Sequence, residues 1–275
     1  MSALRIPDFR LDDRVALVTG GTGVLGSVMA RGLAAAGARV AVLGRRVEQA
    51  EAVAACIRTE GGEALATPAD VLDRAGLEVV RDALMQRWGR IDVLVNAAGG
   101  HHPGAVLAPE QSLADLDLGA MRSVMELNFF GSFLPTQVVA EAMAAQGSGS
   151  ILFVSSMAAT RAVTRVAGYS AAKAAIENFT RWAAVTLARR HGPEVRVNAI
   201  APGFFLAEQN RRLLVDDDGE LTERGRAILH NTPMGRFGEP DELLGALLWL
   251  ASDAGRFVTG AVVPVDGGFS VFSGV

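Results

Sequence analysis

A tyrosine and a lysine four residues apart are the first candidates for chemistry in this sequence. Tyr169 and Lys173 lie in an alanine-rich segment without proline, which predicts a helix from about residue 168 to residue 190. Residues four apart share one helix face, so both side chains can reach a common ligand. A neighbouring ammonium favours the phenolate, so the pair is suited to exchanging a proton. The alternative is an ordinary aromatic residue beside an exposed lysine.

A glycine-rich segment near the N-terminus is the second candidate. Residues 14–18 form a short apolar run, residues 19–26 read TGGTGVLG, and a helical pattern continues to residue 36 before a second apolar run at 39–43. This order predicts strand, turn, helix and strand. In that setting glycines let the backbone approach a pyrophosphate, and the helix N-terminus directs free N–H groups at it. The alternative is a tight turn that binds nothing.

The residues after the second apolar run bear on the choice of cofactor. A site that prefers NAD(H) usually carries Asp or Glu there for the ribose 2′-hydroxyl. This chain has Arg45 and Arg46, and its next carboxylate is Glu48. An arginine can hold a 2′-phosphate through paired hydrogen bonds. The sequence therefore favours NADP(H) and leaves NAD(H) possible, while the alternative is that both arginines are merely solvated.

The rest of the chain continues the alternation of strand and helix. Further strands are expected at 64–67, 91–95, 151–154 and 195–200, and further helices at 47–60, 73–88 and 123–145. Asp73 is the expected N-cap of its helix, and Pro135 is expected to kink its helix or mark its first third. This alternation predicts a single α/β domain over residues 1–275. Its centre is expected to be a Rossmann-type, doubly wound parallel sheet of about seven strands with helices on both faces.

Polar residues recur at the predicted strand ends, where open α/β sheets bind ligands. They are Thr19 with Gly20, Asp70, Asn96, Ser155 with Ser156, and Pro202. Because the carboxyl ends of parallel strands meet at one edge of a sheet, we expect a single site there.

Composition excludes several classes of function. The chain has 275 residues, 50% of them hydrophobic, and a formal net charge of −4 without a dense basic cluster, so a nucleic-acid partner is not expected. The single cysteine, Cys56, cannot form an intramolecular disulfide and fits a reducing compartment. No leader segment and no apolar run long enough to span a bilayer is visible, so a cytoplasmic protein without membrane contact is expected.

Several short motifs occur together in an order typical of one enzyme family. They are Thr19-Gly20 to Gly26, Asp70-Val71, Asn96-Ala97-Ala98-Gly99, Asn128, Ser156, Tyr169 with Lys173, and Pro202-Gly203. Jointly they resemble the short-chain dehydrogenase/reductase family, and the likeness extends from Phe9 to Gly268. The resemblance implies hydride transfer between a nicotinamide cofactor and a carbonyl or secondary alcohol.

The resemblance also implies roles for four residues. Tyr169 would exchange a proton with the substrate oxygen, and Lys173 would lower the pKa of Tyr169 and bind the nicotinamide ribose. Ser156 would hydrogen-bond the substrate carbonyl, and Asn128 would hold a water molecule that links Lys173 to solvent. This division suits the chemistry, because hydride transfer changes the charge on the substrate oxygen, where Ser156 and Tyr169 would meet.

The implied cofactor contacts follow the same motifs. The pyrophosphate turn comprises Gly20, Thr22, Gly23, Val24, Leu25 and Gly26; Asp70 and Val71 contact adenine; Asn96, Ala97, Ala98 and Gly99 line the adenosine side; Pro202, Gly203 and Phe205 contact nicotinamide. The sequence departs from the family pattern twice. Val24 stands where a glycine is usual, which bears on the turn, and Ala207 stands where Thr or Ser is common, which bears on the grip on the carboxamide.

Candidate substrate residues lie around the predicted active site. They are His101 and His102 after the fourth strand, Arg161 and Arg165 between Ser156 and Tyr169, and Gln209, Asn210 and Arg211 in a polar segment, 204–236, expected to cover the substrate. Histidine can bind sugar hydroxyls or a carboxylate, and arginine can bind a carboxylate. The alternative for each is an ordinary surface position. Adjacent histidines point to different sides and no third ligand is visible, so no metal is expected.

Longer stretches refine the resemblance. GGHHP, PGFFLAEQNR, TPMGRFGEP and VPVDGGFSVFSGV are similar to the D-mannonate oxidoreductase (fructuronate reductase) members of the family, with gluconate 5-dehydrogenase-like enzymes as near relatives. A sugar-acid substrate is thereby implied. Residues 258–268 resemble the last strand of the family, which with the preceding helix, 239–251, forms a subunit interface, so the resemblance also implies a homotetramer. That subgroup is usually associated with NAD(H), whereas Arg45 favours NADP(H). The alternatives are a 3-oxoacyl carrier-protein reductase and a non-catalytic cofactor sensor of the same fold.

Overall fold

Seven parallel strands form the centre of the computed structural model, which describes residues 6–206, 214–216 and 218–274. In space their order is β3-β2-β1-β4-β5-β6-β7. The strands are β1 Val15–Thr19, β2 Arg39–Gly44, β3 Glu63–Pro68, β4 Val93–Asn96, β5 Gly149–Val154, β6 Val195–Pro202 and β7 Val262–Val265. The strand order reverses between β1 and β4, and such a reversal is where open α/β sheets bind ligands.

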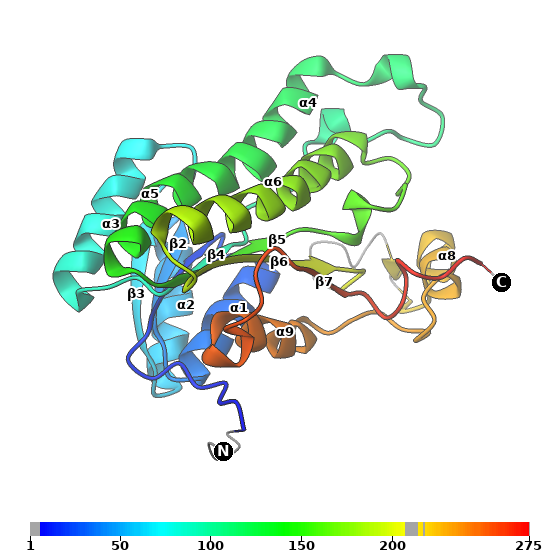
Figure 1. Ribbon diagram of the computed structural model, residues 1–275. Coiled ribbons are helices and arrows are strands. Elements are labelled where there is room, and N and C mark those ends of the chain that lie inside the picture. The colour runs from blue at the N-terminus through cyan, green and yellow to red at the C-terminus, as the bar shows by residue number, and fades with distance from the viewer. Residues whose placement is uncertain (1–5, 207–213, 217, 275) are drawn as a thin grey trace.

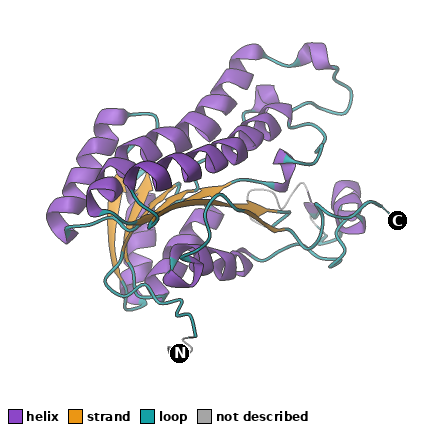
Figure 2. Ribbon diagram, viewed as in Figure 1, coloured by secondary structure: helices purple, strands orange, loops and turns teal. Residues whose placement is uncertain are grey.

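Helices cover both faces of the sheet (Figures 1 and 2). One face carries α3 Arg74–Trp88, α5 Gly131–Gln146 and α6 Ala167–His191; the other carries α1 Val24–Ala35, α2 Val47–Thr59 and α9 Leu244–Ala251. The shorter helices α4 Leu118–Met125 and α8 Glu223–His230 lie beyond the sheet, near the carboxyl ends of its strands (Figure 1).

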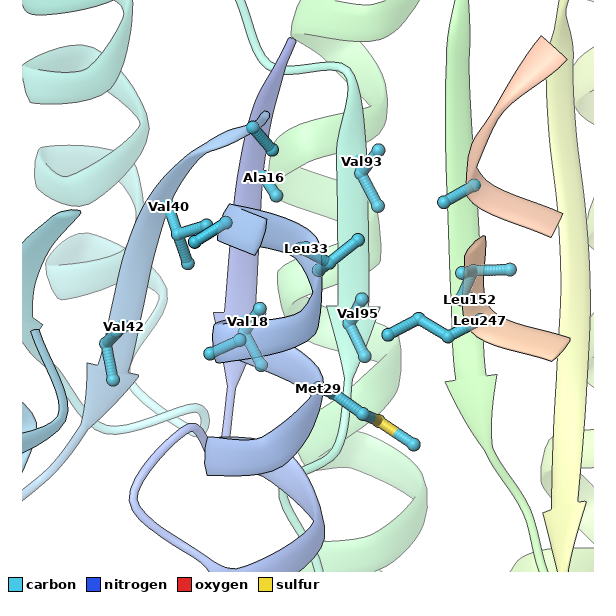
Figure 3. Close-up of a cluster of buried hydrophobic side chains, with 14 of the residues drawn as sticks. Ala16, Val18, Met29, Leu33, Val40, Val42, Val93, Val95, Leu152 and Leu247 are labelled. Atoms are coloured by element: carbon cyan, nitrogen blue, oxygen red, sulfur yellow. The ribbon is translucent and has the colours of Figure 1, made fainter. Parts of the chain in front are cut away.

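Alternation along the strands explains the two layers. Ala16 and Val18 of β1 pack beneath α1, whereas Leu17 between them packs on the opposite face. Figure 3 shows the first set, in which Met29 and Leu33 of α1 lie over the strands. Successive strand residues point to opposite faces, and both faces of a parallel sheet are covered, so the strands read as almost unbroken apolar runs.

The predicted α/β fold and its doubly wound parallel sheet are confirmed. Asp73 accepts a hydrogen bond from the Ala75 N–H and caps α3, as predicted. Pro135 is the fifth of sixteen residues in α5, within its first third.

Three details differ from the sequence-based prediction. The helix expected at 123–145 begins at Leu118 and is interrupted by a π-helical turn, Glu126–Phe130, which no local propensity signals. The first turn of the helix expected at 239–251 is a 3₁₀ helix, Pro240–Leu243, and the α-helix proper begins at Leu244. Helix α8 was not predicted, because its segment reads as a polar loop that covers the substrate.

Candidate active site

The glycine-rich turn between β1 and α1 brings two backbone segments into close contact. Gly20 has φ +62°, and a Cβ atom placed on it would lie 2.6 Å from the Ala98 nitrogen. A Cβ atom on Gly26 would lie 2.2 Å from the Gly20 carbonyl oxygen. Only glycine fits at these two positions without a shift of the backbone.

The same turn leaves the start of α1 accessible to an anion. Gly23 is the N-cap and offers no side chain to the first-turn N–H groups, and Val24 is the first helical residue. The turn therefore forms with valine where a glycine is usual. Free N–H groups and the positive end of the helix dipole suit a pyrophosphate, so the chain's own geometry fits a dinucleotide here.

Ser156, Tyr169 and Lys173 come together at the carboxyl end of β5 and the first turns of α6. Ser156 is 7% exposed, and its Oγ accepts a hydrogen bond of 3.2 Å from the Ala158 N–H. The Tyr169 phenol, half-buried, interacts with the Ser156 hydroxyl. Lys173 lies with its Nζ 5.4 Å from the centroid of the Tyr169 ring. Two hydroxyl groups and an amine thus surround one small volume, as the sequence predicts.

Burial dominates the acidity of this cluster. Removal from solvent raises the pKa of the Tyr169 phenol, and the Ser156 hydroxyl opposes this only in part. Burial also lowers the pKa of the Lys173 amine to about 8. The expected lowering of the Tyr169 pKa by Lys173 is not what this structure shows. The Lys173 amine instead donates a 2.7 Å hydrogen bond to the Val154 carbonyl.

Asn128 fixes the loop that follows β4. It lies in the π-helical turn and is fully buried. Its Nδ2 donates to the Gly100 carbonyl at 2.8 Å, and its Oδ1 accepts from the Gly100 N–H at 3.1 Å. A Cβ atom on Gly99 would lie 2.7 Å from the Asn128 Oδ1 and 3.4 Å from the Lys173 Nζ. Asn128 therefore holds residues 99–100 beside Lys173.

The two adjacent histidines have different surroundings. The His101 ring lies against the Tyr169 ring, with centroids 4.4 Å apart and planes tilted by 46°. The His102 Nδ1 accepts a hydrogen bond of 3.2 Å from the Gly104 N–H and caps the 3₁₀ helix Pro103–Ala105. Of the two, His101 is the one that packs against Tyr169. No group of three or more potential metal ligands occurs among the residues that the structure describes.

The two predicted arginines also differ. The Arg161 Nε donates to the Ser270 carbonyl, which ties the loop after Ser156 to the C-terminal segment. The Arg165 Nε donates to the Leu107 carbonyl at 2.9 Å, and Arg165 has a positive φ of 79°. Its remaining guanidinium nitrogens have no hydrogen-bond partner within the described ranges.

Sequence reasoning missed a third arginine, Arg224, in the second position of α8. It is half-buried, and burial together with the positive charge of Arg165 lowers its pKa. Neither arginine has an ion-pair partner among residues 6–206, 214–216 and 218–274. One signal in the sequence was Thr222, a residue type that favours helix N-caps. Its hydroxyl accepts a hydrogen bond from the Gly225 N–H and caps α8, inside the segment 204–236 that was predicted only to cover the substrate.

The remaining predicted cofactor residues line the same edge of the sheet. Arg45 and Arg46 are exposed between β2 and α2. Asp70 Oδ1 accepts from the Leu72 N–H at 2.9 Å, and Val71 is 5% exposed against Gly131. Asn96 is buried, and its Nδ2 donates to Thr136 while its Oδ1 has no partner among the described residues.

A cavity of about 350 Å³ lies beyond the ends of β6 and β7. Phe204, Phe205, Met234, Asp266 and Gly267 are among its lining residues. Its lining begins at Phe204, directly after Pro202 and Gly203 in the chain, and contains none of the catalytic cluster. Ala207, Gln209, Asn210 and Arg211 lie outside the described residues.

Comparisons with known proteins agree with this geometry. A family model described as enoyl-(acyl carrier protein) reductase matches residues 22–270. The "uncharacterized oxidoreductase UxuB" of Bacillus subtilis strain 168 is 47% identical over 274 residues, which cover 96% of this chain and 98% of that protein. This chain belongs to the short-chain dehydrogenase/reductase family. It is therefore an NAD(P)-dependent oxidoreductase that acts on alcohol or carbonyl groups.

Two crystal structures of family members are similar over almost their whole length. One, from Haemophilus influenza with bound NAD, is named a "putative D-mannonate oxidoreductase"; its TM-score is 0.89 at 43% identity, covering 97% of this chain and 98% of that one. The other is a gluconate 5-dehydrogenase from Burkholderia cenocepacia in complex with NADP and tartrate; its TM-score is 0.85 at 36% identity, covering 96% of this chain and 98% of that one.

Among the described residues, no helix is long and apolar enough to cross a membrane.

Proposed function

We propose that this oxidoreductase interconverts a ketone and a secondary alcohol within a sugar acid, such as fructuronate and mannonate. The observation that carries the proposal is the pair of arginines Arg165 and Arg224, of which Arg165 lies four residues before Tyr169. The two guanidinium groups lie close enough for their charges to repel, and no carboxylate among the described residues balances them. A bound carboxylate relieves that repulsion and can accept paired hydrogen bonds from a guanidinium group.

The position of the pair fits a short carbon chain. Arg165 precedes α6 by two residues, and Tyr169 is in the first turn of that helix. A substrate whose carboxylate meets the arginines can thus present a carbonyl to Tyr169 a few carbons away. The relative crystallised with tartrate, a hydroxy acid, and the relatives named for mannonate and gluconate support the same class of substrate.

In the proposed mechanism Ser156 and Tyr169 hold the substrate oxygen by hydrogen bonds. During reduction Tyr169 gives that oxygen its proton, and during oxidation it takes the proton back. Lys173 supplies positive charge beside the phenol and holds the cofactor ribose, while Asn128 anchors the loop at Gly99 and Gly100 and retains a water molecule for proton exchange with solvent. A bound nicotinamide supplies or accepts the hydride.

The cofactor is held, in this proposal, by the predicted turn from Gly20 to Gly26 and by the predicted residues at the ends of β3, β4 and β6. Arg45 and Arg46 are exposed at the end of β2 and free to meet a 2′-phosphate, which supports NADP(H). One similar structure holds NAD and another holds NADP, so the relatives do not distinguish the two cofactors. The preference for NADP(H) therefore rests on Arg45 and Arg46.

A substrate panel with a matched pair of variants tests the proposal. Hexuronates and aldonates, neutral ketoses and polyols, and 3-oxoacyl esters are each assayed with NAD(H) and NADP(H). Arg224→Gln should raise KM for the acids by about 10- to 100-fold, the loss expected when a charged hydrogen bond is removed, and should leave neutral substrates unchanged. Arg226→Gln is the control, because Arg226 lies on the same helix with its guanidinium donating to the Leu221 carbonyl.

Two further outcomes decide between the alternatives. Turnover of acyl esters alone would replace the sugar acid with a carrier-protein substrate. Tyr169→Phe should lose about 10²- to 10⁴-fold in kcat while still binding cofactor. A variant that retains full rate would remove Tyr169 from the acid–base role, and a wild-type chain that binds cofactor without turning over any substrate would favour a sensor.

We also infer a homotetramer, in which segment 204–236 covers the substrate of each subunit. Exposed apolar side chains on α4, α6 and the π-helical turn support association; they are Leu118, Phe130, Trp182 and Val185. Light scattering after size exclusion should give about four times the chain mass of 28.8 kDa. A mass equal to one chain would contradict the assembly.

The single cysteine and the nicotinamide cofactor support a cytoplasmic location.

A further inference from the structure

His101 packs against the catalytic cluster from outside it, and the mechanism above gives it no task. Its ring lies against the Tyr169 ring at 4.4 Å, on the loop directly after β4. That loop is fixed, because Asn128 makes two hydrogen bonds to Gly100, the preceding residue. The imidazole is therefore held beside the phenol by a rigid segment.

The contact with Tyr169 uses the ring of His101 and leaves its nitrogens available. Neither ring nitrogen has a hydrogen-bond partner within the part of the chain that the structure describes. Partial burial, assisted by the positive charge of Lys173, lowers the pKa of His101, which favours the neutral imidazole. A neutral imidazole offers one N–H donor and one nitrogen acceptor, which matches a hydroxyl group.

We propose that His101 binds the substrate hydroxyl on the carbon adjacent to the reacting carbon, and thereby selects hydroxy-ketones over plain ketones. The proposal rests on the proposed function in one respect, that the reacting oxygen lies at Ser156 and Tyr169. Oxygens on adjacent carbons of a carbohydrate are close together, so two side chains in contact with each other can hydrogen-bond one oxygen each. A ring packed on Tyr169 is therefore placed to hold the next oxygen along the chain.

The test combines two substrates with three variants. The substrates are a hydroxy-ketone acid that the wild-type enzyme reduces and its analogue without the hydroxyl next to the carbonyl. His101→Phe keeps a ring against Tyr169 and removes both nitrogens, whereas His101→Asn keeps a donor and an acceptor and removes the ring. His102→Asn is the matched control, because the amide oxygen can replace the Nδ1 that caps Pro103–Ala105.

His101→Phe should lower kcat/KM for the hydroxy-ketone about tenfold, as expected for one lost hydrogen bond, and should leave the analogue within about twofold. The wild-type preference for the hydroxylated substrate should therefore shrink by the same factor. His101→Asn should retain more of that preference than His101→Phe, and His102→Asn should retain all of it.

An equal loss on both substrates would overturn the proposal, because His101 would then only support Tyr169. Unchanged kinetics in His101→Phe would overturn it as well. Thermal melting of each variant separates either result from a folding defect. Rejection of all sugar acids by the wild-type enzyme, with reduction of other hydroxy-ketones, would refute the proposed substrate class and leave this comparison valid.

Discussion

At the scale of single residues, Lys173 shows how the site departs from ordinary core chemistry. The chain buries an amine that is 4% exposed and gives it one hydrogen bond, to the Val154 carbonyl. A buried charge with a single neutral partner is unfavourable, and this lowers the pKa of Lys173 from 10.5 to about 8. A buried amine of this kind is unfavourable for the stability of the fold, which is consistent with a functional role for Lys173.

The burial of Lys173 has a consequence for stability. Below pH 8 the amine is charged in both states, and the folded state carries the whole penalty, roughly 3 kcal/mol for a pKa that falls from 10.5 to about 8. Between about pH 8 and 10.5 the unfolded chain holds a proton that the folded chain has released. The free energy of unfolding therefore rises with pH in this window.

Lys173→Met should remove this dependence. The variant should be more stable than the wild type at pH 7, and its advantage should shrink as pH approaches 10. Denaturant unfolding at pH 7 to 9.5 measures the difference. The range stops there because the pKa of Tyr169 is raised, so above pH 10 the phenol contributes with the opposite sign. A constant difference between the two proteins across this range would contradict the low pKa.

At the scale of elements, the β1–α1 turn is determined by the contact between Gly20 and Gly26. The helix starts one residue after Gly23 with its first-turn N–H groups uncapped by any side chain, so its start is held by tertiary contact. Valine is tolerated at position 24 because it is the first helical residue and its backbone needs no positive φ.

Gly26→Ala should disrupt this element. The added methyl group would lie 2.2 Å from the Gly20 carbonyl oxygen, so the backbone must move, at about 1–3 kcal/mol of stability. Cofactor affinity should fall with it, because the displaced turn is the proposed pyrophosphate site. Calorimetric titration with NADP(H) and thermal melting measure both effects.

Gly245→Ala provides the control for that substitution. Gly245 lies within α9, and a Cβ atom there meets nothing within 4 Å. Alanine should stabilise this helix by about 0.5–1 kcal/mol and leave cofactor binding unchanged. A Gly26→Ala protein with normal affinity would show that the turn does not hold the cofactor.

At the scale of the whole molecule, patterns local in the sequence were the predictable ones. Apolar runs of strand length, separated by helical patterns, specified the sheet, and polar residues at strand ends specified the edge where the site lies. Ser156 and Tyr169 could be predicted to share one site, because Ser156 directly follows β5 and Tyr169 lies at the start of the next long helix.

Features that depend on tertiary contact could not be predicted. No sequence pattern separates His101, which packs on Tyr169, from His102, which caps a short helix. Arg224 and Arg165 are far apart in the chain, and only folding brings their charges together. The raised pKa of Tyr169 likewise follows from burial, which spacing alone does not reveal.

The hydrogen bond from Arg161 to the Ser270 carbonyl joins the C-terminal segment to the loop after Ser156. Phe269 also packs edge-on against Phe204, so this segment contacts both the loop after Ser156 and the start of segment 204–236. Under the proposed function, substrate preference depends on three stretches that are distant in the sequence. A chimera that grafts only one of them from a relative would mismatch the other two, so engineers seeking a new specificity would do better to exchange all three together.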